Sequence, residues 1–117
     1  MSSHGSPLRV EVRPGKDATI VKLTGSAGME VAGKLRDQLL SLINAETRRL
    51  IVDMSELEFI NSVGLGGIVA AHLRCRKSDG EVHLVSPQPS IRALLELTKL
   101  TKLFSIHDSI ESAIAQV

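Results

Sequence analysis

The 117-residue sequence has almost no aromatic side chains: it contains no tryptophan, no tyrosine and only two phenylalanines. Proteins that bind single-stranded nucleic acid stack the bases on aromatic rings, so this scarcity argues against such a role. The net charge is only +1 and there is no block of lysine and arginine, which argues against binding through nucleic-acid phosphates. We therefore expect a core of leucine, isoleucine, valine and alanine, and no nucleic-acid partner.

Cysteine and long apolar runs are also scarce. Cys75 is the only cysteine, so no intrachain disulfide can form, which is typical of a reducing compartment. The longest stretch without a formal charge, residues 59–73, is too short to span a bilayer. The first residues, MSSHGSP, lack the apolar segment of a signal peptide. We expect a cytoplasmic protein without membrane insertion, with a flexible tail at residues 1–7 and one domain at residues 8–117.

The alternation of strand-like and helix-like apolar patterns along the chain predicts an α/β fold. Residues 8–13 and 18–24 read as strands of an antiparallel hairpin around a turn at residues 14–17. Residues 25–28 are expected to be a flexible junction. Further strands are predicted at 50–52, 81–85 and 104–107, and helices at 29–44, after residue 62, at 91–98 behind an N-cap at Ser90, and at 110–117 behind an N-cap at Asp108 or Ser109. Right-handed crossovers then give a mixed, mostly parallel sheet with about four helices.

The rest of the chain is organised around residues 50–76. Its apolar strand is interrupted by the polar residues Asp53, Ser55 and Glu56. The apolar residues Phe59 and Ile60 then return the chain to the core. Asn61 and Ser62 precede a helical pattern of apolar residues, and either side chain suits a helix N-cap. In α/β proteins the loop after a strand lies at the carboxyl edge of the sheet, where functional sites concentrate. We therefore place the candidate site at this polar cap.

The histidines and glycines form no motif for catalysis or metal binding. The four histidines are scattered, and His72 with Cys75 would be too few ligands for a zinc site. Ser62 and His72 would lie about 15 Å apart along a helix, too far for a nucleophile and its base. The glycines at 64, 66 and 67 lack the spacing and the lysine of a phosphate-binding loop. We expect no catalytic residue and no metal site.

Ser62 has a structural and a functional interpretation. Spacing alone favours the structural one, in which Asn61 or Ser62 simply caps the helix. The functional one is that an exposed serine at a helix N-terminus is a good phosphate acceptor. There the free N–H groups and the helix dipole stabilise an added charge of about −1.5 to −2. The two interpretations are compatible.

The run DMSELEFINSVGLGGIV resembles the STAS domain of anti-sigma factor antagonists. That family's pattern is aspartate, an apolar residue and serine, then aromatic-apolar-Asp-Ser-Ser/Thr-Gly-Leu. The matching residues are Asp53, Met54, Ser55, Phe59, Ile60, Ser62, Gly64 and Leu65. The resemblance covers nearly the whole chain, including VSPQPSIRALLELTKL near the C-terminus, which is similar to the family's Ser-Pro-helix-Thr-Gly-Leu. Three residues depart from the pattern: Asn61 replaces aspartate, Val63 replaces a second hydroxyl residue, and Lys99 replaces glycine.

The resemblance implies a partner-switching protein that is not an enzyme. In this family the unphosphorylated antagonist binds an anti-sigma factor of the histidine-kinase-like ATPase fold, and a sigma factor is released. The kinase phosphorylates the serine at the position of Ser62, and a PP2C-type phosphatase reverses the reaction. The ATP belongs to the partner, so no cofactor is implied for this chain. The implied partner surface comprises Asp53, Ser55, Asn61, Ser62, Gly64 and Leu65.

The alternative is a constitutive STAS scaffold subunit, in a stressosome-like assembly or a lipid-transport ATPase complex. In that role the cap serine need not be phosphorylated. A neighbouring gene for a kinase-like ATPase would favour switching, whereas neighbouring permease genes would favour the scaffold.

Overall fold

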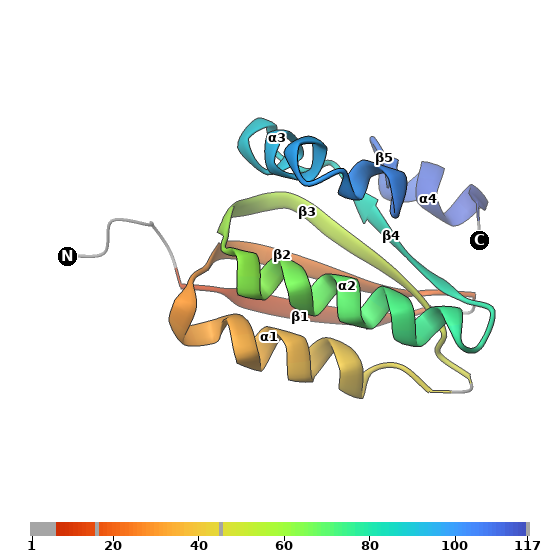
Figure 1. Cartoon of the computed structure of the whole chain (residues 1–117). Coiled ribbons are helices and arrows are strands. Elements are labelled where there is room, and N and C mark those ends of the chain that lie inside the picture. The colour runs from red at the N-terminus through yellow and green to blue at the C-terminus, as the bar shows by residue number, and fades with distance from the viewer. Residues whose placement is uncertain (1–6, 16, 45, 117) are drawn as a thin grey trace.

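The computed structural model describes residues 7–15, 17–44 and 46–116 (Figure 1). Residues 1–6 of the expected tail, Lys16 of the expected turn, Ala45 and Val117 lie outside the described residues. The elements in chain order are β1 (Arg9–Pro14), β2 (Thr19–Ala27), α1 (Met29–Ser41), β3 (Arg49–Ile60), α2 (Ser62–Arg76), β4 (Glu81–Val85), α3 (Pro89–Leu97), the 3-10 turn η1 (Leu100–Lys102), β5 (Ser105–His107) and α4 (Ile110–Gln116).

The described strands form one sheet in the order β1-β2-β3-β4-β5. β1 runs antiparallel to β2, and the other neighbouring strands are parallel. The predicted mixed, mostly parallel sheet with an N-terminal hairpin is therefore confirmed. Figure 1 shows α1 and α2 side by side against one face of this sheet. A parallel sheet covered in this way brings the carboxyl ends of β2 and β3 to one edge, next to the start of both helices.

The core is aliphatic, as the composition predicts. Its larger part joins the sheet to α1, α2 and α3, and a smaller part beneath α4 contains Ile51, Val85 and Ala113. Cys75 of α2 is fully buried in the larger part, and burial raises the pKa of its thiol to about 11. This thiol is therefore protonated and unreactive near neutral pH.

β3 differs most from the expectation. The predicted short strand followed by a polar loop is wrong, because one strand runs without interruption through Ile60 and contains Asp53, Ser55 and Glu56. Two β-bulges explain the difference. Met54 and Ser55 together lie opposite Leu23 of β2, and Glu58 is an extra residue before Phe59. A bulge lets polar side chains face outward while the pairing of the strands continues.

The boundaries of several helices and strands also differ from the predicted ones. β2 continues through Ala27, so residues 25–28 do not form a flexible junction; Gly25 (φ 91°) adopts a left-handed conformation within the strand. α1 ends at Ser41, before the predicted end at Asn44. The side chain of Asn44 accepts the N–H groups of residues 46 and 47 and so forms a turn.

The helices near the C-terminus begin differently from one another. Ser90 does not cap α3: Gln88 occupies the cap position without a side-chain cap bond, and Pro89 opens the helix. Proline suits this first position because its fixed φ is helical and it has no N–H to satisfy. Ser109 does cap α4, since its Oγ accepts the N–H of Ser112 at 3.1 Å.

Candidate functional site

Asn61 joins β3 to α2 and caps the helix. Its backbone is extended, and its side-chain Oδ1 accepts the N–H of Gly64 at 2.8 Å. Its backbone carbonyl accepts the N–H of Leu65 at 3.0 Å. Of the two cap candidates that the sequence offered, Asn61 therefore fills the role, and Ser62 is left without it.

Ser62 is the first residue of α2, and its side chain is exposed. Within the part of the chain that the structure describes, its hydroxyl makes no hydrogen bond. The N–H groups of the first helical turn lack intrahelical acceptors and carry the positive end of the helix dipole. An anion attached to Ser62 would thus lie at a place where the helix favours negative charge.

Two exposed apolar side chains flank the cap. Val63 follows Ser62 and is 51% exposed, and Met29, the first residue of α1, is 80% exposed. The Nδ2 of Asn61 lies 3.6 Å from the Met29 sulfur, a weak hydrogen bond that joins the starts of α1 and α2. Met29 was not among the residues predicted for the site. The signal was available: Met29 follows β2 as Asn61 follows β3, and neighbouring parallel strands end at the same edge.

The glycines of α2 have different surroundings. A Cβ at Gly64 would lie 2.9 Å from Cγ1 of Ile60, and a Cβ at Gly67 would lie 2.8 Å from Cβ of Arg36 on α1. Both glycines therefore permit close packing. Gly66 is exposed, and a Cβ there would meet no atom within 4 Å. Gly66 thus contributes open surface one turn along from Ser62.

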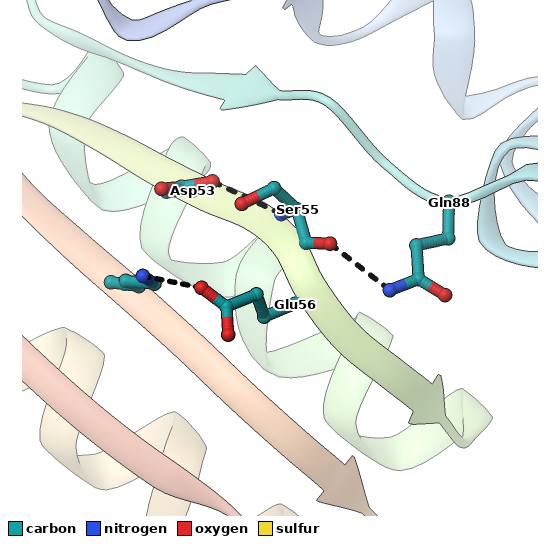
Figure 2. Close-up of polar contacts among 5 residues, drawn as sticks. Asp53, Ser55, Glu56 and Gln88 are labelled. Atoms are coloured by element: carbon teal, nitrogen blue, oxygen red, sulfur yellow. Dashed lines mark hydrogen bonds and ion pairs between the residues drawn. The ribbon is translucent and has the colours of Figure 1, made fainter.

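The first bulge of β3 carries the other predicted site residues (Figure 2). Asp53 is only 7% exposed, and its Oδ1 accepts the N–H of Ser55 at 3.0 Å. Ser55 is exposed, and its carbonyl accepts a hydrogen bond from Nε2 of Gln88 at 3.0 Å. Gln88 was not among the residues predicted for the site. These two bonds hold the bulge from within β3 and from the start of α3.

Glu56 lies next to this bulge and pairs with Lys22 of β2 at 2.6 Å (Figure 2). The hydrogen bond from Lys22 to Glu56 raises the pKa of the Lys22 ammonium. Both side chains are partly exposed, so water and salt screen the pair. The pair nevertheless neutralises the carboxylate of the β3 bulge that lies beside Ser55.

The predicted site residues therefore fall into two groups. Asn61, Ser62 and Gly64 meet in the first turn of α2, whereas Asp53 and Ser55 share the bulge of β3. Leu65 is only 4% exposed and belongs to the core. Burial does not test whether these residues bind a partner, so that assignment stays a prediction.

The histidines among the described residues have local partners. His72 accepts the N–H of Val82 at 3.1 Å and packs edge-on against Phe104. His83 Nδ1 lies 2.9 Å from His107 Nε2, a hydrogen bond that joins β4 to β5. Among the described residues no three His, Cys, Asp or Glu side chains are grouped so that they could hold a metal ion. The described helices also include none that is long and apolar enough to cross a membrane.

A family model described as STAS domain matches residues 8–113. The anti-sigma F factor antagonist of Paenibacillus polymyxa is 23% identical over 111 residues, which cover 94% of this chain and 95% of that protein. The crystal structure of an anti-sigma factor antagonist from Mycobacterium paratuberculosis is 25% identical, with a TM-score of 0.84 over 95% of this chain and 94% of that one. The structure of unphosphorylated SpoIIAA is 18% identical, with a TM-score of 0.80 over 94% of this chain and 95% of that one, a likeness of fold.

Proposed function

Because the chain belongs to the STAS domain family, we propose that it is an anti-sigma factor antagonist. In its unphosphorylated form it binds an anti-sigma factor of the histidine-kinase-like ATPase fold, and a sigma factor is released. Transfer of a phosphate from ATP to Ser62 by that partner ends the binding, and a PP2C-type phosphatase restores it. The chain itself supplies no catalytic residue and binds no cofactor, and it works in the cytoplasm.

The position of Ser62 carries the proposal. Its hydroxyl is exposed and free of hydrogen bonds within the described residues, and it stands at the N-terminus of a helix that another residue already caps. A kinase can therefore reach the oxygen without first breaking the cap. The next residue, Val63, has no hydroxyl, so Ser62 is the only hydroxyl acceptor in this turn.

The partner surface comprises exposed residues and buried residues that position them. Ser62 and Ser55 make direct contacts, and Met29 and Val63 add apolar area beside Ser62. Asn61, half-buried, joins Met29 to the cap. The buried members of the predicted set act through their neighbours: Asp53 fixes the bulge, the N–H of Gly64 donates the cap bond, and Leu65 anchors the helix in the core.

Phosphate on Ser62 acts on binding more than on folding. Within the domain, the helix N-terminus favours the added charge. Glu56 and Asp53 oppose it little, because they lie six and nine residues before Ser62 along the extended strand β3, up to about 20 and 30 Å away at 3.3 Å per residue, and salt screens exposed charges over such distances. At a protein interface the phosphate must be desolvated or must meet acidic groups of the partner, and neither cost is offset.

The test measures phosphorylation and binding on the same set of proteins. The parent, Ser62→Ala, Ser62→Asp and Ser55→Ala are incubated with the cognate anti-sigma kinase and ATP, and intact mass is recorded. The parent and Ser55→Ala should gain one phosphate, and Ser62→Ala should gain none. In a titration with the partner, Ser62→Ala should bind like the parent and Ser62→Asp at least tenfold more weakly.

Two outcomes would contradict the proposal. Equal binding by Ser62→Asp and the parent would exclude switching at this residue and favour the constitutive scaffold. If Ser62→Ala gained as much phosphate as the parent, the acceptor would be a residue other than Ser62.

A further inference from the structure

β1 is an edge strand whose outer side has no partner strand among the described residues. Almost all of its side chains are exposed. An edge of this kind presents unpaired N–H and C=O groups, to which another strand can add. Natural edge strands often avoid this by being very short or by carrying charges, which repel a second copy when they are of one sign. β1 has six residues and carries charges of both signs.

The two faces of β1 differ in chemistry. On one face Arg9, Glu11 and Arg13 alternate in charge; they lie opposite residues 24, 22 and 20 of β2. On the other face Val10 and Val12 lie opposite Leu23 and Val21, which are fully buried on the side of the sheet that α1 and α2 cover. Val12 remains 38% exposed, so this apolar layer is open at the edge of the sheet.

We propose that two copies of this chain associate by antiparallel pairing of their β1 edges across a twofold axis. In this pairing Arg9 of one copy faces Glu11 of the other, and Val10 faces Val10 of the other copy at the axis. Leu8 of one copy faces Val12 of the other. The two five-stranded sheets become continuous, and the open end of the apolar layer around Val12 is covered.

The sequence of β1 selects this register. A twofold axis normal to the sheet keeps each face on its own side, so only registers that pair residues of the same face are allowed. A register with Glu11 at the axis would place Glu11 opposite itself and Arg9 opposite Arg13, and like charges directly opposite each other are unfavourable. A register that pairs Glu11 with Arg13 places Val10 opposite Pro14, which has no N–H and ends the strand.

The association leaves the proposed phosphorylation site free. Ser62 follows β3, and β2 separates β3 from β1 in the sheet. A pairing of six-residue strands buries less area than a standard interface, so the dimer is weak and its population depends on concentration. Because its charge pairs are exposed, added salt weakens it. This proposal does not depend on the function proposed above.

The test uses charge reversal at the paired positions. Sedimentation velocity of the full chain at rising concentration should show a monomer–dimer equilibrium for the parent. Arg9→Glu and Glu11→Arg should each weaken association at least tenfold. In either variant residues 9 and 11 carry the same charge, and the dimer contains two pairs of these residues facing each other. An equal mixture of the two variants should associate again, since the carboxylates at residues 9 and 11 of the first variant then face the guanidinium groups at residues 11 and 9 of the second. A chain that carries both substitutions should also recover.

Arg13→Glu is the matched control, since residue 13 faces no charge in this register, and it should associate like the parent. Recovery in the mixture also shows that the single variants are folded. Parent chains that remain monomeric at every concentration would overturn the proposal. Loss of association in Arg13→Glu but not in Arg9→Glu would overturn the register, and no recovery in the mixture would overturn the pairing of the charges.

Discussion

The side chain of Asn61 accepts the backbone N–H of Gly64 at 2.8 Å, and this bond encloses the two exposed residues that begin α2. Capping and the proposed modification are thus assigned to adjacent residues. Because Asn61 satisfies the helix, Ser62 can gain or lose a phosphate without the cap being lost.

Asn61→Ala should lower the free energy of unfolding by about 1 kcal/mol, because the N–H of Gly64 loses its side-chain acceptor. Asn61→Asp is the matched control: its carboxylate can accept the same bond, and its charge suits a helix N-terminus. Chemical denaturation of both variants measures the effect. Equal stability of the alanine and aspartate variants would show that the cap contributes nothing.

Gly66→Ala and Gly67→Ala should change stability in opposite directions although the residues are adjacent. At Gly66 a methyl group meets no atom within 4 Å, so alanine's better helix propensity should add up to about 1 kcal/mol. At Gly67 the methyl group would approach Arg36 Cα of α1 to 3.1 Å, and overpacking of this kind costs about 1–3 kcal/mol. Thermal melting compares them, and a Gly67→Ala variant as stable as Gly66→Ala would mean that α1 and α2 are not held at this spacing.

The domain should lose stability as the pH falls below about 6.5. Burial lowers the pKa of His72 and of His83 from 6.5, so the folded state binds fewer protons than the unfolded state in this range. The stability from these neutral histidines is complete above the unfolded pKa and is lost as the pH falls toward the lowered folded values. Glu81, 3.4 Å from His83 Nε2, offsets only part of the effect. Urea unfolding between about pH 8 and pH 5 measures it.

A double variant, His72→Asn with His83→Asn, serves as the control for this pH dependence. Asparagine at residue 72 keeps an acceptor for the N–H of Val82, and neither asparagine titrates. The slope of stability against pH should flatten in this variant. A slope as steep as that of the parent would assign the titration to other groups.

Ser62→Asp should leave the fold intact and raise the free energy of unfolding by about 0.3–1 kcal/mol relative to Ser62→Asn. The two side chains have nearly the same shape, so the difference isolates the charge at the helix N-terminus. Thermal melting at low ionic strength gives the comparison. If the aspartate variant melted well below the asparagine variant, a negative charge at residue 62 would act by disrupting the domain.

The sequence was sufficient for the parts of the fold that follow from periodicity, such as the hairpin and the helices after β2 and β3. It was insufficient at β3, because bulges break the alternation that identifies a strand. The residues of β3 that belong to the larger part of the core are Leu50, Val52, Met54, Leu57 and Ile60. Their spacing is two, two, three and three, and each step of three is a bulge. Polar residues at 53, 55 and 56 made the same segment look like a loop.

The position of the polar cap at the carboxyl edge of the sheet could be predicted from topology, but the details of the cap needed coordinates. Either Asn61 or Ser62 could have been the cap on residue type alone, and only the bond to Gly64 distinguishes them. Met29 and Gln88 come from elements distant in sequence, so local patterns could not link them to residues 55–62. Lys99, which replaces the family's glycine, adopts a left-handed φ of 62°, a conformation that its residue type would not have suggested.

The paired bulges of β3 restrict how this strand can change in length during evolution. β2 from Thr19 to Ala27 is matched by β3 from Leu50 to Ile60, which contains two more residues. Each bulge absorbs one extra residue, so the pairs on either side of it keep their faces and Ile60 still lies opposite Ala27. Loss of one codon at a bulge would therefore restore regular pairing there and leave Ile60 in the core. Loss of one codon elsewhere in the segment would turn the side chains on one side of the deletion to the opposite face, so deletions that survive should concentrate at residues 54–55 and 58.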